Sequence, residues 1–231
     1  MKNFNGKTVL TFDCYGTLID WESGLWGALE PVLKRHGQAL GREGALELFG
    51  PLEAEQEHGP YKTYRQVLGE TLKGIGAKLG FKPSDDEVRT FGGSVGDWPA
   101  FPDSADALAS LKQRFKLVVI TNCDDDLFAL SNKKLKVQFD HVITAQQAKS
   151  YKPSPNNFHV AFKRIGVPQG EILHVAQSLF HDHVPAKQLG LTSVWINRRR
   201  GKAGAGATPP ANAKPEYEYP DMKSFAADAR A

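Results

Sequence analysis

The sequence predicts an α/β protein in which helices cover a parallel sheet and a purely helical segment interrupts the core. Short runs rich in Val and Ile alternate with helical patterns over most of the 231 residues, which is typical of parallel strands buried by helices on both faces. Residues 21–96 break this alternation and carry helical patterns only. The composition, 41% hydrophobic and 24% charged, is that of an ordinary globular protein.

The expected strands are short β-branched runs that end in polar residues. The first run, KTVLTFD, ends at Asp13 and is followed by a turn containing Cys, Tyr, Gly and Thr. Later runs occupy residues 115–123, 141–145, 172–178 and 192–197, with a shorter one at 216–221. Helical patterns lie between them at residues 104–114, 124–134, 155–166 and 183–190. The stretch from Gly201 to Lys214 is rich in Gly, Ala and Pro and is expected to be a loop.

The interrupting segment is expected to fold as a separate helical domain. Residues 23–37, 44–59 and 64–80 have amphipathic patterns with glycines at or near their ends. Pro99 and Pro102 prevent a continuous helix through residues 96–104, which therefore form the return connection. We expect a core domain made of residues 1–20 and 97–231, with residues 21–96 inserted as a helical domain.

Charge and cysteine content narrow the function classes. The formal net charge of +3 does not by itself indicate nucleic-acid or membrane binding. The two cysteines, Cys14 and Cys123, cannot form a disulfide framework and favour a reducing compartment. No secretory signal or membrane-spanning run is recognised. We expect a cytoplasmic protein that binds a small molecule, and the sequence leaves open whether it is a homodimer.

Polar residues gather where the predicted strands end. Open parallel sheets bind ligands beyond the carboxyl ends of their strands. The first strand brings Asp13 and Thr17 to that edge, and the second brings Thr121 and Asn122. The segments after the third and fourth strands add three further candidates, Lys152, Gln177 and Asp182.

Taken in order, these stretches resemble the motifs of the haloacid dehalogenase superfamily of hydrolases. DCYGT resembles the first motif, VVITN the second, YKPSPNNF the third and FHDHVPAKQLGLTSVWINR the fourth. The resemblance runs from Lys7 to Arg198. It implies a Rossmann-like core, a helical cap at residues 21–96, and Asp13 as a covalent nucleophile.

Tyr15 indicates which branch of the superfamily the chain resembles. Members that act on phosphate esters have a second Asp two places after the nucleophile, which protonates the leaving alkoxide. Here the residue is Tyr15, and a phenol with an unperturbed pKa near 10 is a poor acid for that task. A halide leaves without a proton. The resemblance is therefore to the type II L-2-haloacid dehalogenases, which cleave a carbon–halogen bond of a small halogenated carboxylic acid.

Gln177 indicates that no metal or other cofactor is needed. Phosphate-transferring relatives hold magnesium with a carboxylate after the fourth strand, and a neutral amide is a poor ligand for a hard cation. Lys152 would then supply the positive charge that keeps Asp13 ionised. The resemblance assigns Asp182 to positioning the water that hydrolyses the ester intermediate, and Thr17 to holding Asp13 by a hydrogen bond.

The expected substrate site departs from the pattern of that branch at several positions. Gly50 stands where the branch has a halide-binding cap arginine, so Arg65 or Arg42 would have to substitute. Phe158 replaces an active-site tyrosine. Gln177 and Leu179 stand where the branch has Ser and Asn. The predicted substrate-binding residues are Tyr15, Thr121, Asn122, Phe158, Gln177 and Arg65, of which Asn122 would cradle the halide and Thr121 the substrate carboxylate.

Three other functions remain open at this point, and one of them is a hydrolase of the same superfamily that acts on another small carboxylate substrate. A magnesium-dependent phosphatase of the same superfamily is disfavoured by Tyr15 and Gln177. A non-catalytic binding protein on the same scaffold is disfavoured by the joint presence of Asp13, Lys152 and Asp182.

Overall fold

The computed structural model describes residues 4–201 and 206–230 and contains a six-stranded parallel sheet in the order β3-β2-β1-β4-β5-β6. β1 (Val9–Phe12) lies in the middle, with Val9 beside Lys116 of β2 and Ile172 of β4. The strands are β2 (Lys116–Thr121), β3 (His141–Thr144), β4 (Ile172–Ala176), β5 (Ser193–Ile196) and β6 (Tyr217–Tyr219). The predicted fold class and all six predicted strands are confirmed.

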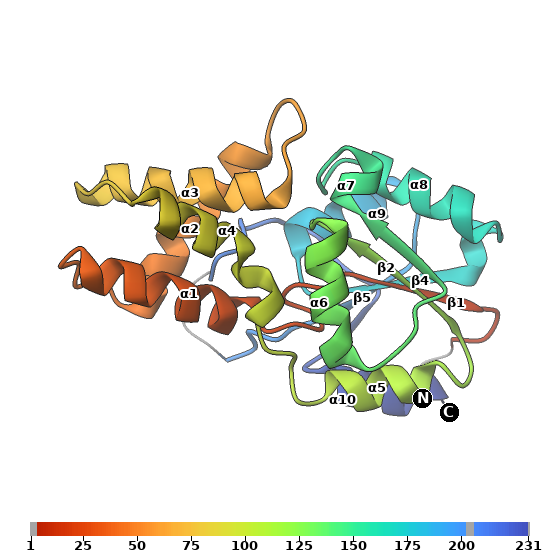
Figure 1. The fold of residues 1–231 in the computed structure, drawn as a ribbon. Helices are drawn as coiled ribbons and strands as arrows, with labels where there is room; N and C mark the ends of the chain where they lie inside the picture. The colour runs from red at the N-terminus through yellow and green to blue at the C-terminus, as the bar shows by residue number, and fades with distance from the viewer. Residues whose placement is uncertain (1–3, 202–205, 231) are drawn as a thin grey trace.

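The sheet separates two apolar layers, because successive side chains of a strand point to opposite faces. Leu10 and Phe12 of β1 join the larger core, whereas Val9 joins the smaller one. Helices α5 (Ser104–Leu111), α6 (Asp125–Leu135) and α10 (Met222–Arg230) cover the first face (Figure 1). The second is covered by α8 (Asn156–Ile165) and α9 (Val184–Gln188), while α7 (Ala145–Ala148) is a single turn after β3. All four residues of β1 are buried, as a central strand requires.

Four of the five α-helices between β1 and β2 lie to one side of the sheet (Figure 1). They are α1 (Trp21–Arg35), α2 (Arg42–Glu57), α3 (Tyr64–Leu79) and α4 (Asp85–Gly93), followed by the 3₁₀ turn Ser94–Asp97. The first three match the predicted helices. The fourth was not predicted because its sequence, DDEVRTFGG, is mostly polar, although Ser84 and Glu87 form a capping box at its start.

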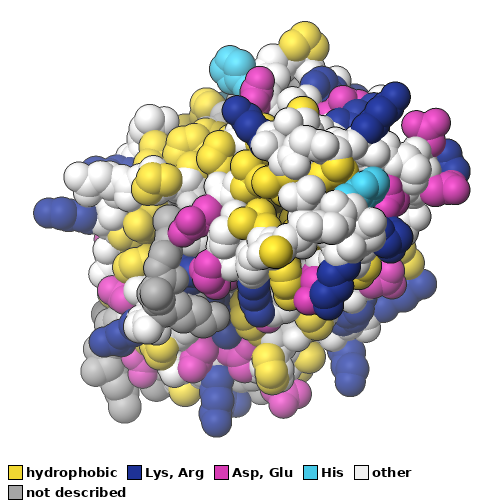
Figure 2. Space-filling model, turned by 90° about the vertical axis from the view of Figure 1, so that its left-hand side faces the viewer, with side chains coloured by type: hydrophobic (Ala, Val, Ile, Leu, Met, Phe, Trp, Pro, Cys, Tyr) yellow, Lys and Arg dark blue, Asp and Glu magenta, His cyan; other side chains and the backbone are white. Residues whose placement is uncertain are grey.

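The remaining connections are short turns and loops. The 3₁₀ turn Gln169–Glu171 precedes β4, and the π-helical turn Leu179–His183 leads into α9. Of the predicted loop Gly201–Lys214, residues 202–205 lie outside the described part, and residues 206–214 contain no helix or strand. No described helix has the length and apolarity that crossing a membrane requires. Basic and acidic side chains are interspersed on the face shown in Figure 2.

Candidate active site

The predicted catalytic residues lie close together at the carboxyl ends of the central strands β2, β1 and β4. Asp13 follows β1 directly, and its backbone N–H donates to the carbonyl of Val175 in β4. The chain then turns back, because the N–H groups of Leu18 and Ile19 both donate to the carbonyl of Cys14. Asp182 lies in the π-helical turn after β4. The fold thus places Asp13 and Asp182 at one edge of the sheet, as the strand-end rule predicts.

Lys152 lies between these two carboxylates. Its Nζ is 2.9 Å from Asp13 Oδ1 and 2.7 Å from Asp182 Oδ1, and it also donates to the carbonyl of Ile120 at 3.0 Å. The lysine residue is 1% exposed. Three acceptors therefore use all three ammonium protons, so this buried charge is fully hydrogen-bonded.

Asn122 holds the backbone of Lys152 in place. Its Oδ1 accepts from the Lys152 N–H at 2.7 Å, and its Nδ2 donates to the Lys152 carbonyl at 3.0 Å. The side-chain amide therefore fixes the point from which the lysine side chain starts. The predicted role of Asn122 was halide binding, and this positioning contact was not foreseen.

Thr17 fixes the second oxygen of Asp13. Its hydroxyl donates to Asp13 Oδ2 at 2.6 Å and accepts from the Gln177 backbone N–H at 2.9 Å. The hydroxyl therefore has its proton directed at the carboxylate. This is the contact expected of Thr17.

A buried chain of hydrogen bonds supports Asp182. His174 Nε2 is 3.0 Å from Asp182 Oδ1, and His174 Nδ1 is 2.9 Å from the hydroxyl of Thr11. With Asp182 ionised, the imidazole donates from Nε2 and accepts from the threonine. Thr11 and His174 are buried residues of strands, so the sequence pattern does not predict which polar groups they contact. Asp182 Oδ2 is buried and has no hydrogen-bond partner among the described residues.

The side chains of Asp13, Lys152 and Asp182 shift one another's pKa values. Burial alone would raise the pKa of Asp182, but the Lys152 ammonium and the His174 N–H outweigh burial and lower it. Burial would likewise lower the pKa of Lys152, whereas the two carboxylates raise it. Asp13 has a pKa above the ordinary aspartate value, because burial and the charge of Asp182 oppose the effect of Lys152. At neutral pH Asp182 is ionised and Lys152 is charged.

Asp13 borders a cavity of about 40 Å³ beneath helices α2 and α3. Core residues Asp13, Lys152, Asp182 and Asn122 line it from below. Its other lining residues are Tyr15, Trp21, Glu53, Glu57, Tyr64, Ser178, His181 and Thr208. Glu53, Glu57 and Tyr64 belong to the inserted helices and were not predicted, because only the tertiary placement of α2 and α3 brings them over Asp13.

At Gly50, where the resembled branch has an arginine, the structure leaves no room for a side chain. A Cβ atom on Gly50 would lie 2.3 Å from the carbonyl oxygen of Ala207, so no side chain fits there. The buried segment around Ala207 occupies this space, and Thr208 beside it lines the cavity. The predicted substitute, Arg65, does not line the cavity. Its guanidinium pairs with Asp126 at 2.5 Å on the surface.

Four other predicted substrate-binding residues have surroundings that differ from the predicted ones. Tyr15 lines the cavity, and its hydroxyl is 3.1 Å from Ser131 Oγ. Phe158 packs against His174 in the smaller core, with ring centroids 5.1 Å apart. Gln177 borders a separate small cavity near Gly16. The hydroxyl of Thr121 is buried and has no hydrogen-bond partner in the described structure. Phe158, Gln177 and Thr121 do not line the cavity beside Asp13.

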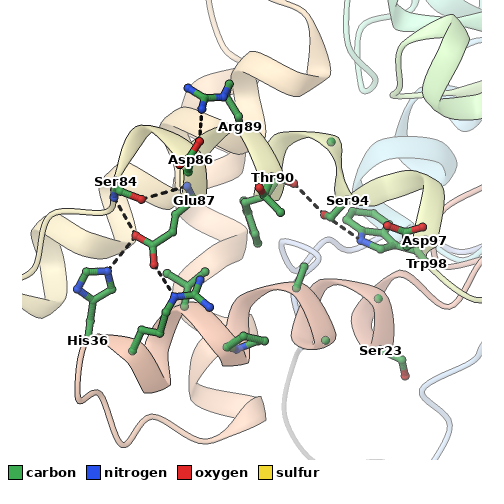
Figure 3. Close-up of a pocket in the computed structure, with 18 of the residues that line it drawn as sticks. Ser23, His36, Ser84, Asp86, Glu87, Arg89, Thr90, Ser94, Asp97 and Trp98 are labelled. Atoms are coloured by element: carbon green, nitrogen blue, oxygen red, sulfur yellow. Dashed lines mark hydrogen bonds and ion pairs between the residues drawn. The ribbon is translucent and has the colours of Figure 1, made fainter.

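A larger groove, of about 1150 Å³, lies elsewhere on the inserted helices, between α1 and α4 (Figure 3). Glu87 crosses it, accepting from Arg35 Nε at 2.9 Å and lying 3.0 Å from His36 Nε2. The pKa of Glu87 is lowered to about 2, chiefly by its hydrogen bond with His36. None of the predicted catalytic residues lines this groove, so it is not the candidate site.

Comparison with known proteins identifies the family. The model of the haloacid dehalogenase-like hydrolases matches residues 7–182. Relatives include (S)-2-haloacid dehalogenase 4A of Burkholderia cepacia, 31% identical over 92% of this chain and 87% of the relative. The (S)-2-haloacid dehalogenase of Pseudomonas putida is 27% identical over 87% of this chain and 88% of the relative. The chain belongs to the haloacid dehalogenase-like hydrolase family and is an enzyme, which confirms the resemblance noted in the sequence.

Solved structures agree in fold. The L-2-haloacid dehalogenase from Xanthobacter autotrophicus with chloropropionic acid covalently bound has a TM-score of 0.80 and 21% identity, covering 97% of this chain and 99% of that one. The similarity therefore extends over the inserted helices as well as the core.

Proposed function

We propose that this hydrolase cleaves the carbon–halogen bond of a small 2-haloacid by attack of Asp13, and releases a 2-hydroxy acid. The observation that carries the proposal is the Asp13–Lys152–Asp182 arrangement at the cavity between the sheet edge and the inserted helices. The names of the relatives, which are (S)-2-haloacid dehalogenases, support the same substrate class. The division into a core of residues 1–20 and 97–231 and a cap of residues 21–96 is part of the proposal.

In the first step, an oxygen of Asp13 displaces halide from the substrate carbon. A carbon–oxygen bond forms as the carbon–halogen bond breaks, and the electron pair leaves with the halide, so no proton is required. Lys152 and Thr17 hold the two oxygens of Asp13 and fix the direction of attack. Orienting the nucleophile in this way lowers the entropic part of the barrier.

In the second step, water hydrolyses the aspartyl ester. Asp182 Oδ2, which is buried at the cavity without a described partner, accepts a proton from the water as it attacks the ester carbonyl. The acyl carbon–oxygen bond of the ester breaks, and the alcohol leaves with the oxygen that Asp13 supplied in the first step, taking the proton held by Asp182. Asp13 keeps one oxygen from water. The second proton of the water passes to solvent, so the balance is haloacid and water giving hydroxy acid, halide and a proton.

The donor set of this site does not fit magnesium. The space between the two carboxylates is filled by Lys152 Nζ, which lies within 3 Å of both. The residue after β4 is Gln177, whose side chain lies near Gly16 and not beside Asp13. The ammonium thus supplies the positive charge that a divalent cation supplies in phosphate-transferring enzymes.

The experiment is halide release from chloro-, bromo- and fluoroacetate and 2-chloropropionate in the presence of EDTA. We expect halide with at least one acid, no halide from Asp13→Asn, and ¹⁸O in Asp13 after turnover in heavy-oxygen water. Hydrolysis of p-nitrophenyl phosphate that depends on added magnesium, without halide release, would contradict the proposal.

A further inference from the structure

The wall of the cavity opposite Asp13 is built from two carboxyl groups. Glu53 and Glu57 are four residues apart on α2, so their side chains lie on the same side of the helix. Both line the cavity, Glu53 being 6% exposed and the Glu57 side chain 8% exposed. Helix α2 therefore presents acidic groups to the space that the substrate must occupy.

Among the described residues, the neighbours of these two groups do not include an unpaired Lys or Arg. Tyr64 of α3 donates its hydroxyl proton to Glu53 Oε1 at 2.5 Å. Glu57 lies 3.4 Å from Asn122 Nδ2, with its Oε2 3.9 Å from His181 Nε2. Burial lowers the pKa of His181 to about 4, so its imidazole is neutral at pH 7.

The charges lining the cavity are unbalanced. Its acidic members are Asp13, Asp182, Glu53 and Glu57, and its only Lys or Arg among the described lining residues is Lys152. That ammonium already has three acceptors. An incoming carboxylate would add one more negative charge to a poorly solvated space, at high electrostatic cost. This electrostatic cost is smaller if either Glu53 or Glu57 is protonated and therefore neutral.

Of these two carboxyl groups, Glu57 has the surroundings that favour the protonated form more strongly. Tyr64 donates to Glu53, which favours the ionised form of Glu53. Glu57 accepts a long hydrogen bond from Asn122 Nδ2 at 3.4 Å, and His181 Nε2, at 3.9 Å, lies beyond hydrogen-bond distance. Burial, followed by the charge of Glu53, raises the pKa of Glu57 well above its usual range. Burial raises that of Glu53 to about 7. Further charged or titratable groups near Glu57 are Lys152 and Tyr151.

We propose that Glu57, in its protonated form, donates a hydrogen bond to the carboxylate of the bound acid, so that the inserted helices hold the anion through a neutral acid and not through an arginine. This inference rests on the proposed function, because it concerns how the same cavity accepts an acid. A haloacid then binds together with one proton. Once free Glu57 has ionised, the affinity for an acid falls about tenfold for each further pH unit.

Propionate is the probe, because it has the acid group of the substrate and cannot react. The infrared spectrum of the propionate complex at about pH 8 is expected to contain the carbonyl band of a protonated carboxyl group. That band is lost in Glu57→Gln and kept in Glu53→Gln. The matched control is Glu55→Gln, which removes an exposed carboxylate from the same helix and should leave the band unchanged.

Proton uptake gives a second readout. Calorimetric titration with propionate in two buffers of different ionisation enthalpy is expected to show uptake that rises with pH in the wild type and in Glu55→Gln. Glu57→Gln keeps a donor amide, so it should bind propionate within a few fold of the wild type at about pH 6, without uptake.

A wild-type complex that lacks the carboxyl band, or a band unaffected by Glu57→Gln, would overturn the inference. These outcomes differ from failure of the proposed function. If halide is released from haloacids but no protonated carboxyl is seen, only the role of Glu57 is wrong. If propionate binds with the band but no haloacid reacts, the anion site stands and the dehalogenase proposal falls.

Discussion

Lys152 Nζ lies 2.9 Å from Asp13 Oδ1 and 2.7 Å from Asp182 Oδ1, so a single buried ammonium joins the two carboxylates that the proposed mechanism uses in successive steps. Because Asp13 follows β1, Lys152 follows β3 and Asp182 follows β4, the contact depends on the pairing of β1 with β2 and β4 and of β2 with β3. A change at Lys152 must therefore affect chemistry and stability together.

Replacing Lys152 with Met should both inactivate and destabilise the enzyme. Loss of one partner from a buried ion pair leaves uncompensated charge and costs about 3–5 kcal/mol. Urea denaturation measures this cost, and halide release should fall at least ~1000-fold. Lys163→Met, at an exposed lysine, should change stability by less than about 0.5 kcal/mol. A stable, active Lys152→Met enzyme would contradict the central role of the ammonium.

Asp182→Asn should stop the reaction after the first step. The isosteric amide cannot take a proton from water, so the ester on Asp13 should accumulate. We expect about one halide per enzyme in a rapid phase and a later rate slower by ~100- to 10,000-fold. Intact-protein mass spectrometry should detect the substrate adduct on the peptide containing Asp13. Normal turnover without an adduct would exclude Asp182 from ester hydrolysis.

Thr17→Val and Thr17→Ser separate the hydroxyl from the shape of the side chain. The hydroxyl donates to Asp13 Oδ2 at 2.6 Å. A hydrogen bond to a charged group contributes about 1.5–3 kcal/mol, so Val should lower kcat/KM by roughly 10- to 150-fold. Ser, which keeps the donor, should recover most of this loss. Equal activity of the two variants would show that the hydroxyl does not orient the nucleophile.

The acid limb of the pH profile should lie above the ordinary aspartate range. Asp13 must be ionised to attack, and its pKa is raised by burial and by Asp182. Protonation therefore begins at a higher pH than for an exposed aspartate, and kcat/KM should fall as pH decreases through that raised value. Stopped-time halide assays with 2-chloropropionate measure the limb. A profile flat down to about pH 4 would contradict the raised pKa.

Tyr15→Phe should have little effect on halide release. The tyrosine hydroxyl is 3.1 Å from Ser131 Oγ and does not contact Asp13. We expect kcat/KM within about threefold of the wild type and a loss of stability near 1 kcal/mol from the missing hydrogen bond. A decrease of more than about tenfold in kcat/KM with unchanged stability would show that the hydroxyl contacts the substrate.

The strands and the polar residues at their ends could be predicted because both follow from local patterns. β-branched runs predict buried strands, and parallel strands bring their carboxyl ends to one edge, which places Asp13, Lys152 and Asp182 together. The contact of Thr17 with Asp13 is also local, since four residues separate them in a tight turn.

The upper wall of the cavity could not be predicted, because it depends on how α2 and α3 lie over the sheet. In the sequence, Glu53 and Glu57 resemble any acidic residues on the exposed side of a helix. Only their burial over Asp13 distinguishes them from Glu55, which is exposed. The charge of Arg65 predicts a role in anion binding, yet the direction of α3 turns this side chain toward Asp126.

The hydrogen bonds that hold Asp13 come from Lys152 and Thr17 of the sheet core, whereas Glu53, Glu57 and Tyr64 come from the inserted helices. Under the proposed function, the residues that break the bond and those of the upper cavity wall therefore come from separate stretches of the gene. Libraries that diversify α2 and α3 alone then test whether the range of accepted acids can change while Asp13, Lys152 and Thr17 stay as they are.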